Sequence, residues 1–258
     1  MNINIELFLL CLTALIIGYL IGSIPFGYIV GKFHGIDITK EGSGSTGTTN
    51  ALRLLGKKAA ILVLLGDFLK GFIAPYVAVY ICQAILSLIM VMGMSGYSLK
   101  RAFFFALIDS YRLLRFHDGM NEYTSISFFV VGSLGALIGH VKSCWIGFKG
   151  GKAVATGVGT LFALDWRVGL ITAIIWALTV YISKYSSLGA LIAVPLSPIF
   201  MFLFKAGSEG QWIYVGYCIL GAAYIIYKHQ ANIQRLISGT EPKVGQKKAE
   251  KEIEVEKT

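Results

Sequence analysis

Charge is scarce in this sequence. Only 14% of its 258 residues are Asp, Glu, Lys or Arg, whereas 55% are hydrophobic. A typical soluble domain carries about 25% charged residues. This chain has too few charged residues to form a water-exposed surface, so an ordinary soluble enzyme is excluded. Apolar runs close to the length of a membrane span recur along the chain. We therefore predict an all-α membrane protein that forms one unit over residues 1–240.

Several catalytic and metal-binding signatures are also missing. The cysteines include no C-x-x-C pair, and none lies at metal-ligand spacing from a histidine, so we expect no disulfide, no metal and no other cofactor. The chain has no H-E-x-x-H motif and no G-x-S-x-G nucleophile elbow. Its polar segments offer no pair of carboxylates as general acid and base. These absences favour a site that binds anions and stabilises developing negative charge.

The apolar pattern predicts about seven transmembrane helices. We expect the first span to be retained, because no basic n-region or cleavage site accompanies it. The fourth is shorter than about 20 residues and requires a tilt, a re-entrant shape or a thin bilayer. The predicted spans cover residues 5–30, 59–82, 126–141, 153–164, 168–183, 188–206 and 211–228.

The basic residues predict the orientation of these spans. The net charge is +9, and most Lys and Arg fall in the segments that follow odd-numbered spans. The positive-inside rule then places the N-terminus outside and the C-terminus in the cytoplasm. The excess positive charge is expected to meet lipid headgroups, so membrane lipids are predicted partners and nucleic acid is not.

Two segments differ from the rest of the chain. Residues 84–125 begin apolar and then become basic and aromatic, which favours a single interfacial helix, with an extra helical hairpin as the alternative. Residues 241–258 are rich in charge and poor in aromatics, which predicts a disordered tail.

The segment 41–50, "EGSGSTGTTN", places glycines 42, 44 and 47 in the G-x-G-x-x-G spacing of dinucleotide-binding folds. That motif needs a preceding strand, but a membrane span precedes it here, and no Lys-Ser/Thr follows as in a Walker A loop. The glycines and hydroxyls still suit an anion cradle at a helix start; the alternative is a flexible polar loop. The candidate phosphate ligands are Ser43, Gly44, Gly47, Thr49, Asn50 and Arg53.

Three further polar segments share the predicted cytoplasmic face. The segment 148–157, "FKGGKAVATG", flanks two glycines with lysines and predicts a second anion site, although basic snorkelling at a helix end would explain it equally well. The serines of "KYSSLG" would be explained by helix capping alone. A solvated amphipathic helix would likewise explain "KHQANIQRLISGTEPK" without a functional role. The candidate residues here are His140, Lys149, Gly150, Gly151, Lys152, Ser186, Ser187, His229 and Asn232. For His140, a buried hydrogen-bonded core histidine is favoured.

Asp67 and Lys70 lie three residues apart within the second predicted span. Intramembrane charges are costly and usually face the protein interior. The two side chains either pair with each other alone or support the cytoplasmic site from beneath, and the sequence favours neither alternative.

Taken together, the motifs resemble those of the bacterial membrane glycerol-3-phosphate acyltransferases that use acyl-phosphate. The resemblance covers nearly the whole chain outside 84–125 and the tail. It rests on the segments "GSIPFGYIVGK", "GSGSTGTTNALRLLGKK", "GDFLKG", "GH" followed by "FKGGKAVAT", "YSSLG" and "HQANIQRLISGTEPK".

The resemblance implies a multi-pass protein of the bacterial cytoplasmic membrane, which we expect to be a monomer. It implies transfer of an acyl group from acyl-phosphate to the sn-1 hydroxyl of glycerol-3-phosphate, giving lysophosphatidate and phosphate in phospholipid biosynthesis. It also implies catalytic roles for Lys152, Ser187, His229 and Asn232, with the other candidates binding phosphate. The family's usual residues differ at Ser45, Thr48, Ala153 and Ala190 of this chain. A small carrier for phosphorylated metabolites is the alternative function.

Overall fold

The computed structural model describes residues 3–93 and 122–246, which are helical with no strand among them. Residues 94–121 of the predicted interfacial helix lie outside the described residues. The ends of that segment belong to α4 and α6. The helices are α1 (Ile3–Gly22), α2 (Phe26–Phe33), α3 (Thr48–Leu55), α4 (Lys57–Gly93), α6 (Glu122–Val141), η1 (Cys144–Ile146), α7 (Val154–Leu164), α8 (Trp166–Ser183), α9 (Ser186–Phe204), α10 (Gln211–Lys228) and α11 (Gln230–Ile237).

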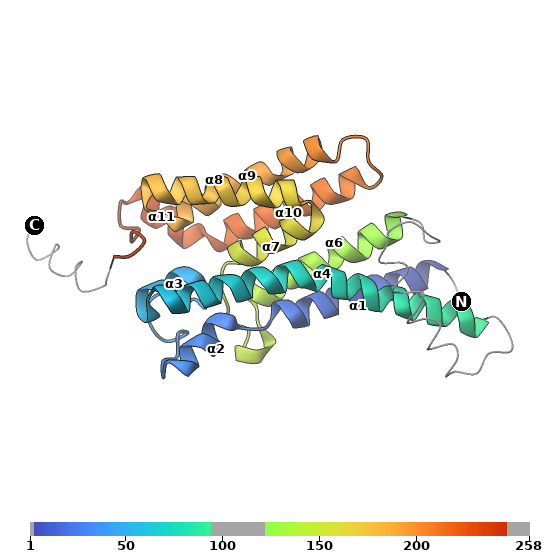
Figure 1. Ribbon diagram of the computed structural model, residues 1–258, viewed down its shortest axis with the longest axis horizontal. Coiled ribbons are helices and arrows are strands. Elements are labelled where there is room, and N and C mark those ends of the chain that lie inside the picture. Colours follow the sequence, from blue (N-terminus) through green and yellow to red (C-terminus); the bar gives the residue numbers. More distant parts are fainter. Residues whose placement is uncertain (1–2, 94–121, 247–258) are drawn as a thin grey trace, which may run out of the picture.

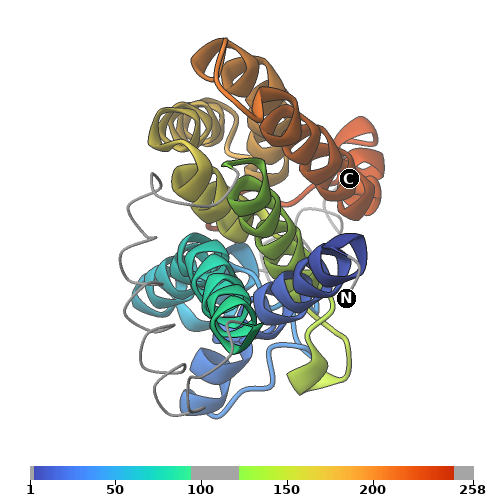
Figure 2. The same cartoon turned by 90° about the vertical axis from the view of Figure 1, so that its right-hand side faces the viewer.

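The long helices run roughly along one direction (Figure 1). The short helices α2, α3 and α11 gather at one end of this bundle, and α1 begins at the other end. Figure 2, which looks along the bundle, shows α6 near its middle with α1 and α4 on one side of it and α8 to α10 on the other, while α7 packs directly against α4. The bundle therefore presents loops and short helices from distant parts of the sequence at a single end.

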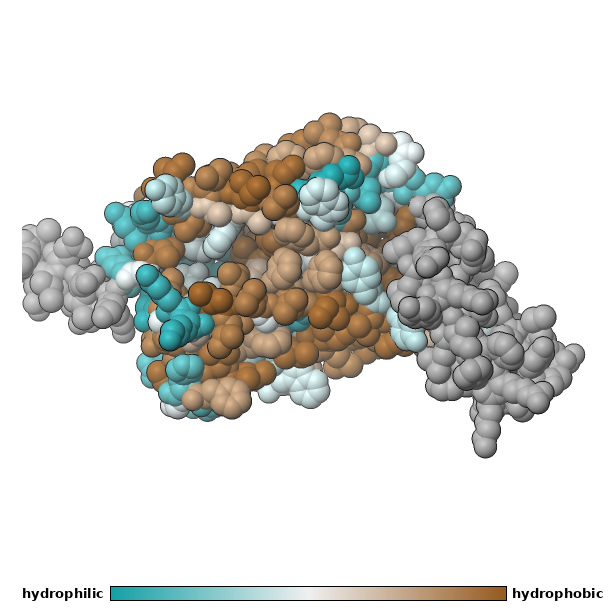
Figure 3. All heavy atoms as spheres, viewed as in Figure 1, coloured by the Kyte–Doolittle hydropathy of each residue, from teal (hydrophilic) through white to brown (hydrophobic). Residues whose placement is uncertain are grey.

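Within residues 3–93 and 122–246, five helical stretches are long and apolar enough to cross a membrane: Ile5–Phe33, Lys57–Ile89, Tyr123–Val141, Trp166–Ser183 and Ser186–Phe204. Helix α7 is apolar but shorter, as its predicted span was, and α10 is not among the five. Figure 3 shows hydrophobic residues over the middle of the visible face and polar residues toward its ends. This distribution suits a bilayer. The count of seven spans and the orientation of the termini remain predictions.

The first predicted span, residues 5–30, is not one continuous helix. Helix α1 ends at Gly22 and α2 starts at Phe26. Proline lacks an N–H and disfavours helical geometry at the preceding residue, so Pro25 breaks the helix at Ile24. The break leaves the Ile24 carbonyl free of helical hydrogen bonding, and Lys70 Nζ donates to it at 2.8 Å.

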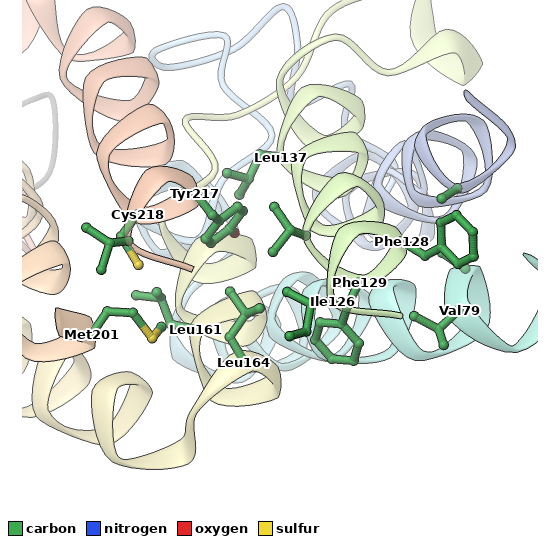
Figure 4. Close-up of a cluster of buried hydrophobic side chains, with 14 of the residues drawn as sticks. Val79, Ile126, Phe128, Phe129, Leu137, Leu161, Leu164, Met201, Tyr217 and Cys218 are labelled. Carbon is green, nitrogen blue, oxygen red and sulfur yellow. The ribbon is translucent and has the colours of Figure 1, made fainter. Parts of the chain in front are cut away.

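The core holds the bundle together by close backbone approach and by apolar packing. A Cβ atom on Gly18 of α1 would lie 2.0 Å from the Gly132 carbonyl oxygen of α6, so these helices meet at a distance that only glycine permits. Figure 4 shows apolar side chains from α4, α6, α7, α9 and α10 packed in one cluster, which includes Phe128, Leu161 and Met201. The ends of α6 and α7 are thereby fixed relative to each other, and the loop between them carries candidate site residues.

Candidate active site

The four polar segments meet at the end of the bundle that carries α2, α3 and α11. Thr49 Oγ1 donates to Ser186 Oγ at 3.3 Å, which links the first segment to the third. Lys152 Nζ donates to Asn232 Oδ1, which links the second to the fourth. Segments separated by up to 137 residues in sequence thus contribute to one site.

A cavity of about 360 Å³ opens at this end. Its walls come from the first two predicted segments, with the end of α6 and of α10. The lining residues are Ser43, Gly44, Ser45, Val141, Lys142, Phe148, Lys149, Gly150, Gly151, Lys152 and Lys228. Four lysines and glycine-rich backbone around one cavity form a site that suits a phosphate group. Six of the predicted site residues line it: Ser43, Gly44, Lys149, Gly150, Gly151 and Lys152.

Asn50 is buried beneath the first loop rather than in the cavity wall. Its Oδ1 accepts a hydrogen bond from the Ser43 amide at 3.0 Å. Its Nδ2 donates to the carbonyl oxygens of Ile38, Glu41 and Ser45 at 3.3, 3.2 and 2.9 Å. With every polar atom of its side chain committed to the loop backbone, Asn50 shapes the loop. Its predicted role as a direct phosphate ligand stays a prediction, and the contacts in the structure add a part in shaping the loop.

Gly47 does not line the cavity either. It is the N-cap of α3 with φ −79°, an ordinary backbone conformation. Gly44, by contrast, has φ +69°, which favours glycine. Arg53 lies in the last turn of α3 and is half-buried, and within the described residues it has no carboxylate partner. Its guanidinium is thus available to an anion.

The second loop rests directly on the end of α6. The Gly151 amide donates to the His140 carbonyl oxygen at 3.1 Å. A Cβ atom on Gly150 would lie 2.1 Å from that same oxygen, and one on Gly151 would lie 2.2 Å from His140 Nε2. Both positions therefore require glycine, and the backbone of the loop follows the position of His140.

His140 itself is buried and does not line the cavity. Its Nδ1 lies 3.0 Å from Thr156 Oγ1 and 3.4 Å from Asp67 Oδ1. The sequence favoured a buried, hydrogen-bonded histidine, and the structure agrees. The role in phosphate binding that the resemblance implied stays a prediction, whereas the contacts of His140 show support of the loop from below.

Lys152 joins the cavity to the remaining site residues. Besides lining the cavity, its Nζ donates to Asn232 Oδ1. Burial of the ammonium group lowers the pKa of Lys152 to about 8, assisted by the positive charges of Arg235, Arg53 and Lys228 and opposed by Glu241. A lysine in this state is charged at neutral pH and poorly solvated, so it binds an anion strongly.

Glu241 is a site residue that the sequence reasoning missed. It is buried, and its Oε1 accepts hydrogen bonds from Ser187 Oγ and Asn232 Nδ2, both at 2.6 Å. Its Oε2 accepts from Arg235 Nε at 2.7 Å. Burial alone would raise the pKa of Glu241, but these three donors together lower it. The carboxylate thus holds Ser187 and Asn232, two predicted catalytic residues, in fixed positions.

The position of Glu241 also corrects the predicted start of the disordered tail. Residue 241 is buried, and the Val244 amide donates to the Lys184 carbonyl oxygen at 2.8 Å. The chain is thus packed against the bundle through this contact. The rest of the predicted tail, residues 247–258, lies outside the described residues. A Glu within "SGTEPK", just after an amphipathic helix, was the sequence signal that could have marked the residue.

His229 occupies the junction of α10 and α11 and is buried. Its Nδ1 lies 2.7 Å from the Ile225 carbonyl oxygen, which can only accept, so Nδ1 carries the proton and Nε2 is an acceptor. Burial, reinforced by the charge of Lys152, lowers the pKa of His229 to about 4 despite the bond to Ile225. The imidazole is neutral, and it can orient a hydroxyl but not neutralise a phosphate.

Comparison with known proteins gives a consistent result. The family model "Glycerol-3-phosphate acyltransferase" matches residues 12–239. A glycerol-3-phosphate acyltransferase of Synechococcus sp. (strain JA-3-3Ab) is 38% identical over 241 residues, covering 93% of this chain and 96% of the relative. The corresponding protein of Trichodesmium erythraeum is 39% identical over 236 residues, covering 90% of this chain and 91% of the relative.

A solved structure resembles this chain over nearly its full length. It is the crystal structure of PlsY (YgiH), an integral membrane glycerol 3-phosphate acyltransferase, in its glycerol 3-phosphate form. The TM-score is 0.66 at 31% sequence identity, and the match covers 91% of this chain and 96% of the other.

Proposed function

Because this chain belongs to the glycerol-3-phosphate acyltransferase family, we propose that it transfers an acyl group from acyl-phosphate to the sn-1 hydroxyl of glycerol-3-phosphate. The products are lysophosphatidate and inorganic phosphate, and the enzyme works as a monomer at the cytoplasmic membrane of a bacterium. The observation that carries the donor assignment is the lysine-lined cavity between two glycine loops. A phosphorylated donor would use such a cavity, because its leaving group is itself a phosphate.

The second loop and Lys152 bind the phosphate of the donor in this proposal. The glycines bring backbone close to the ligand, and the Lys152 ammonium stabilises the negative charge that builds up on the departing phosphate. The hydrogen bond to Asn232 keeps the Lys152 ammonium in one position. This supports the role, because a preorganised charge needs little rearrangement during the reaction.

The first loop and Arg53 bind glycerol-3-phosphate. Ser43 lines the cavity, and Arg53 has a guanidinium that can bind a phosphate through two parallel hydrogen bonds. His229 Nε2 accepts a hydrogen bond from the attacking hydroxyl and orients it toward the acyl carbon. Glu241 keeps Asn232 and Ser187 in place beside Lys152.

The chemical step forms one bond and breaks one. The sn-1 hydroxyl oxygen attacks the acyl carbonyl carbon, and the bond from that carbon to the bridging phosphate oxygen breaks. As the new bond forms, the hydroxyl proton moves from its hydrogen bond with His229 Nε2 to the phosphate of the acyl-phosphate, so the departing group leaves as hydrogen phosphate. Acyl-phosphate is an activated donor, and alignment of the reactants with charge stabilisation can then carry the catalysis.

The test is phosphate release and lysophosphatidate formation by the purified protein in detergent or nanodiscs. Both products should appear only when acyl-phosphate and glycerol-3-phosphate are present together, and NMR of the product should place the acyl group at sn-1. Acyl-CoA and acyl carrier protein serve as alternative donors. Product formation from these donors but not from acyl-phosphate would overturn the donor assignment, and a carrier would form no product at all.

The lysine assignment needs a matched pair of variants. Lys152→Ala should lower kcat/KM by at least about 100-fold through loss of a preorganised charge. Lys32→Ala removes a lysine at the same end of the molecule that pairs with Asp37 at 3.7 Å and does not line the cavity, and it should leave turnover near wild type. Equal activity of the two variants would contradict the proposed role of Lys152.

A further inference from the structure

The ion pair of Asp67 and Lys70 lies inside α4, within a predicted membrane span. Lys70 Nζ is 2.7 Å from Asp67 Oδ1, and the two side chains are 3% and 2% exposed. Replacing a buried ion pair with apolar residues is often neutral or stabilising, so such a pair is weak evidence of a role in stability. In a membrane span an apolar pair would also insert more readily. The contacts that the pair makes with other elements are therefore informative.

The pair itself contacts the break between α1 and α2 and the end of α6, and His140 extends this network to the start of α7. Lys70 Nζ donates to the Ile24 carbonyl oxygen, 2.8 Å away, at the break between α1 and α2. Asp67 Oδ1 lies 3.4 Å from His140 Nδ1 in the last turn of α6. The same nitrogen is 3.0 Å from Thr156 Oγ1 in the first turn of α7. The pair thus joins α4 to the elements on both sides of the second loop.

His140 connects the ion pair to the second loop. His140 Nδ1 lies between Asp67 Oδ1 and Thr156 Oγ1, and these two contacts orient the ring. Gly151 lies against Nε2 of that ring, and its amide is bonded to the His140 carbonyl oxygen. Lys152 is the next residue. A shift of His140 would therefore move the loop backbone and the Lys152 ammonium together.

We propose that Asp67 and Lys70 are positioning residues: they hold His140 and the end of α1 so that the 149–152 loop and Lys152 are set for the phosphate group. The inference rests on the proposed function for the identity of that phosphate, which belongs to the donor. Neither residue touches substrate.

The test uses the double variant Asp67→Asn/Lys70→Met, which removes both charges at once and leaves no lone buried charge. We expect it to fold and to melt at or above the wild-type temperature. Binding of inorganic phosphate and kcat/KM should both fall by about 10- to 100-fold, because a misplacement of about 1 Å is enough for such losses. Hydrogen exchange of a peptide covering residues 149–153 should become faster, while exchange in α8 and α9 stays unchanged.

Gln83→Met is the matched control on the same helix. Gln83 is buried and donates to Ser125 Oγ at 3.4 Å, and it has no contact with the loop. This variant should change only the melting temperature. If the double variant does not fold, Thr156→Val provides a second test, because it removes the threonine hydroxyl that contacts His140. Thr156→Val should weaken phosphate binding, and Thr156→Ser, which keeps a hydroxyl there, should restore it.

The outcomes separate this inference from the proposed function. A folded double variant with wild-type phosphate affinity, turnover and loop exchange overturns the positioning role. If Lys152→Ala also leaves phosphate binding and turnover intact, the role that the proposed function gives to Lys152 is wrong as well. If Lys152→Ala is impaired and the double variant is not, only the positioning role is wrong.

Discussion

Two glycine loops form the same cavity but are supported in different ways. The first loop is supported from within by Asn50, whose partners all lie within 12 residues of it in sequence. The second is supported from beneath by His140, which is itself held by side chains of α4 and α7. The support of the first loop is therefore local in sequence, whereas the support of the second loop depends on how α4, α6 and α7 pack together.

The largest difference between the loops should come from alanine at Gly150. A Cβ atom there would lie 2.1 Å from the backbone oxygen of His140, which cannot move without α6. Gly150→Ala should lower kcat/KM by about 100-fold or more, because the loop must shift. Gly47→Ala in the first loop places its Cβ 3.4 Å from Ser45 Oγ, an ordinary contact. It should lose less than about tenfold, and equal losses would show that the loops do not differ as described.

The next largest effect should follow from Asn50→Ala. The substitution leaves the Ser43 amide and the Ile38 and Ser45 carbonyl oxygens without the partner they have in Asn50, while the Glu41 carbonyl keeps its hydrogen bond from the Gly44 amide. A lost network of this kind costs about 1–3 kcal/mol of local stability. Since the first loop binds glycerol-3-phosphate in our proposal, its KM should rise about tenfold or more while the KM for acyl-phosphate stays close to wild type. An equal rise in both KM values would argue against separate binding loops.

The second loop should also give the site its pH dependence. The pKa of Lys152 is lowered to about 8, chiefly by burial, so its ammonium loses its proton as the pH rises through about 8. Affinity for a phosphate bound there should fall toward tenfold per pH unit above that value. Lys152→Arg should give a flat profile because arginine keeps its proton. Titration of phosphate affinity from pH 7 to 9.5 checks this, and a flat wild-type profile would contradict it.

Glu241 offers a way to shift that profile. Its negative charge raises the pKa of Lys152 against the effect of burial. Glu241→Gln should therefore move the fall in affinity to lower pH. In our proposal the first loop binds the other substrate, so its affinity should stay unchanged in both variants.

The sequence predicts this comparison only in part. Apolar runs located the long helices but not the break in the first span or the short helices α3 and α11, and the glycine and lysine spacing drew attention to both loops. The roles of Asn50 and His140 were not predictable, because residue type indicates that a side chain is polar but not which backbone groups fold around it. Glu241 was assigned to the tail because its segment is rich in charge and poor in aromatics, and composition does not reveal that its partners Ser187 and Asn232 come from other elements. Pro25 did mark the break in the first span, but the continuous apolar pattern around it outweighed the signal.

The smallest expected effect concerns Ala153, where the second loop enters α7. Ala153 has φ +59°, a left-handed conformation that costs a non-glycine residue about 1–2 kcal/mol. Glycine, which the resemblance places at this position, would relieve that strain. It would also remove a fully buried methyl group, worth about 0.8 kcal/mol, and increase the entropy of the unfolded chain by a further 0.4 to about 1 kcal/mol.

These opposing contributions nearly cancel, so Ala153→Gly should change the free energy of unfolding by less than about 1 kcal/mol. Ala193→Gly provides the contrast, because Ala193 is equally buried within α9. There the methyl group and helix propensity are lost without any relief of strain, a cost of about 2 kcal/mol. Denaturant titration of both variants checks the difference. Equal destabilisation by Ala153→Gly and Ala193→Gly would mean that the left-handed conformation of Ala153 at the start of α7 stores no strain.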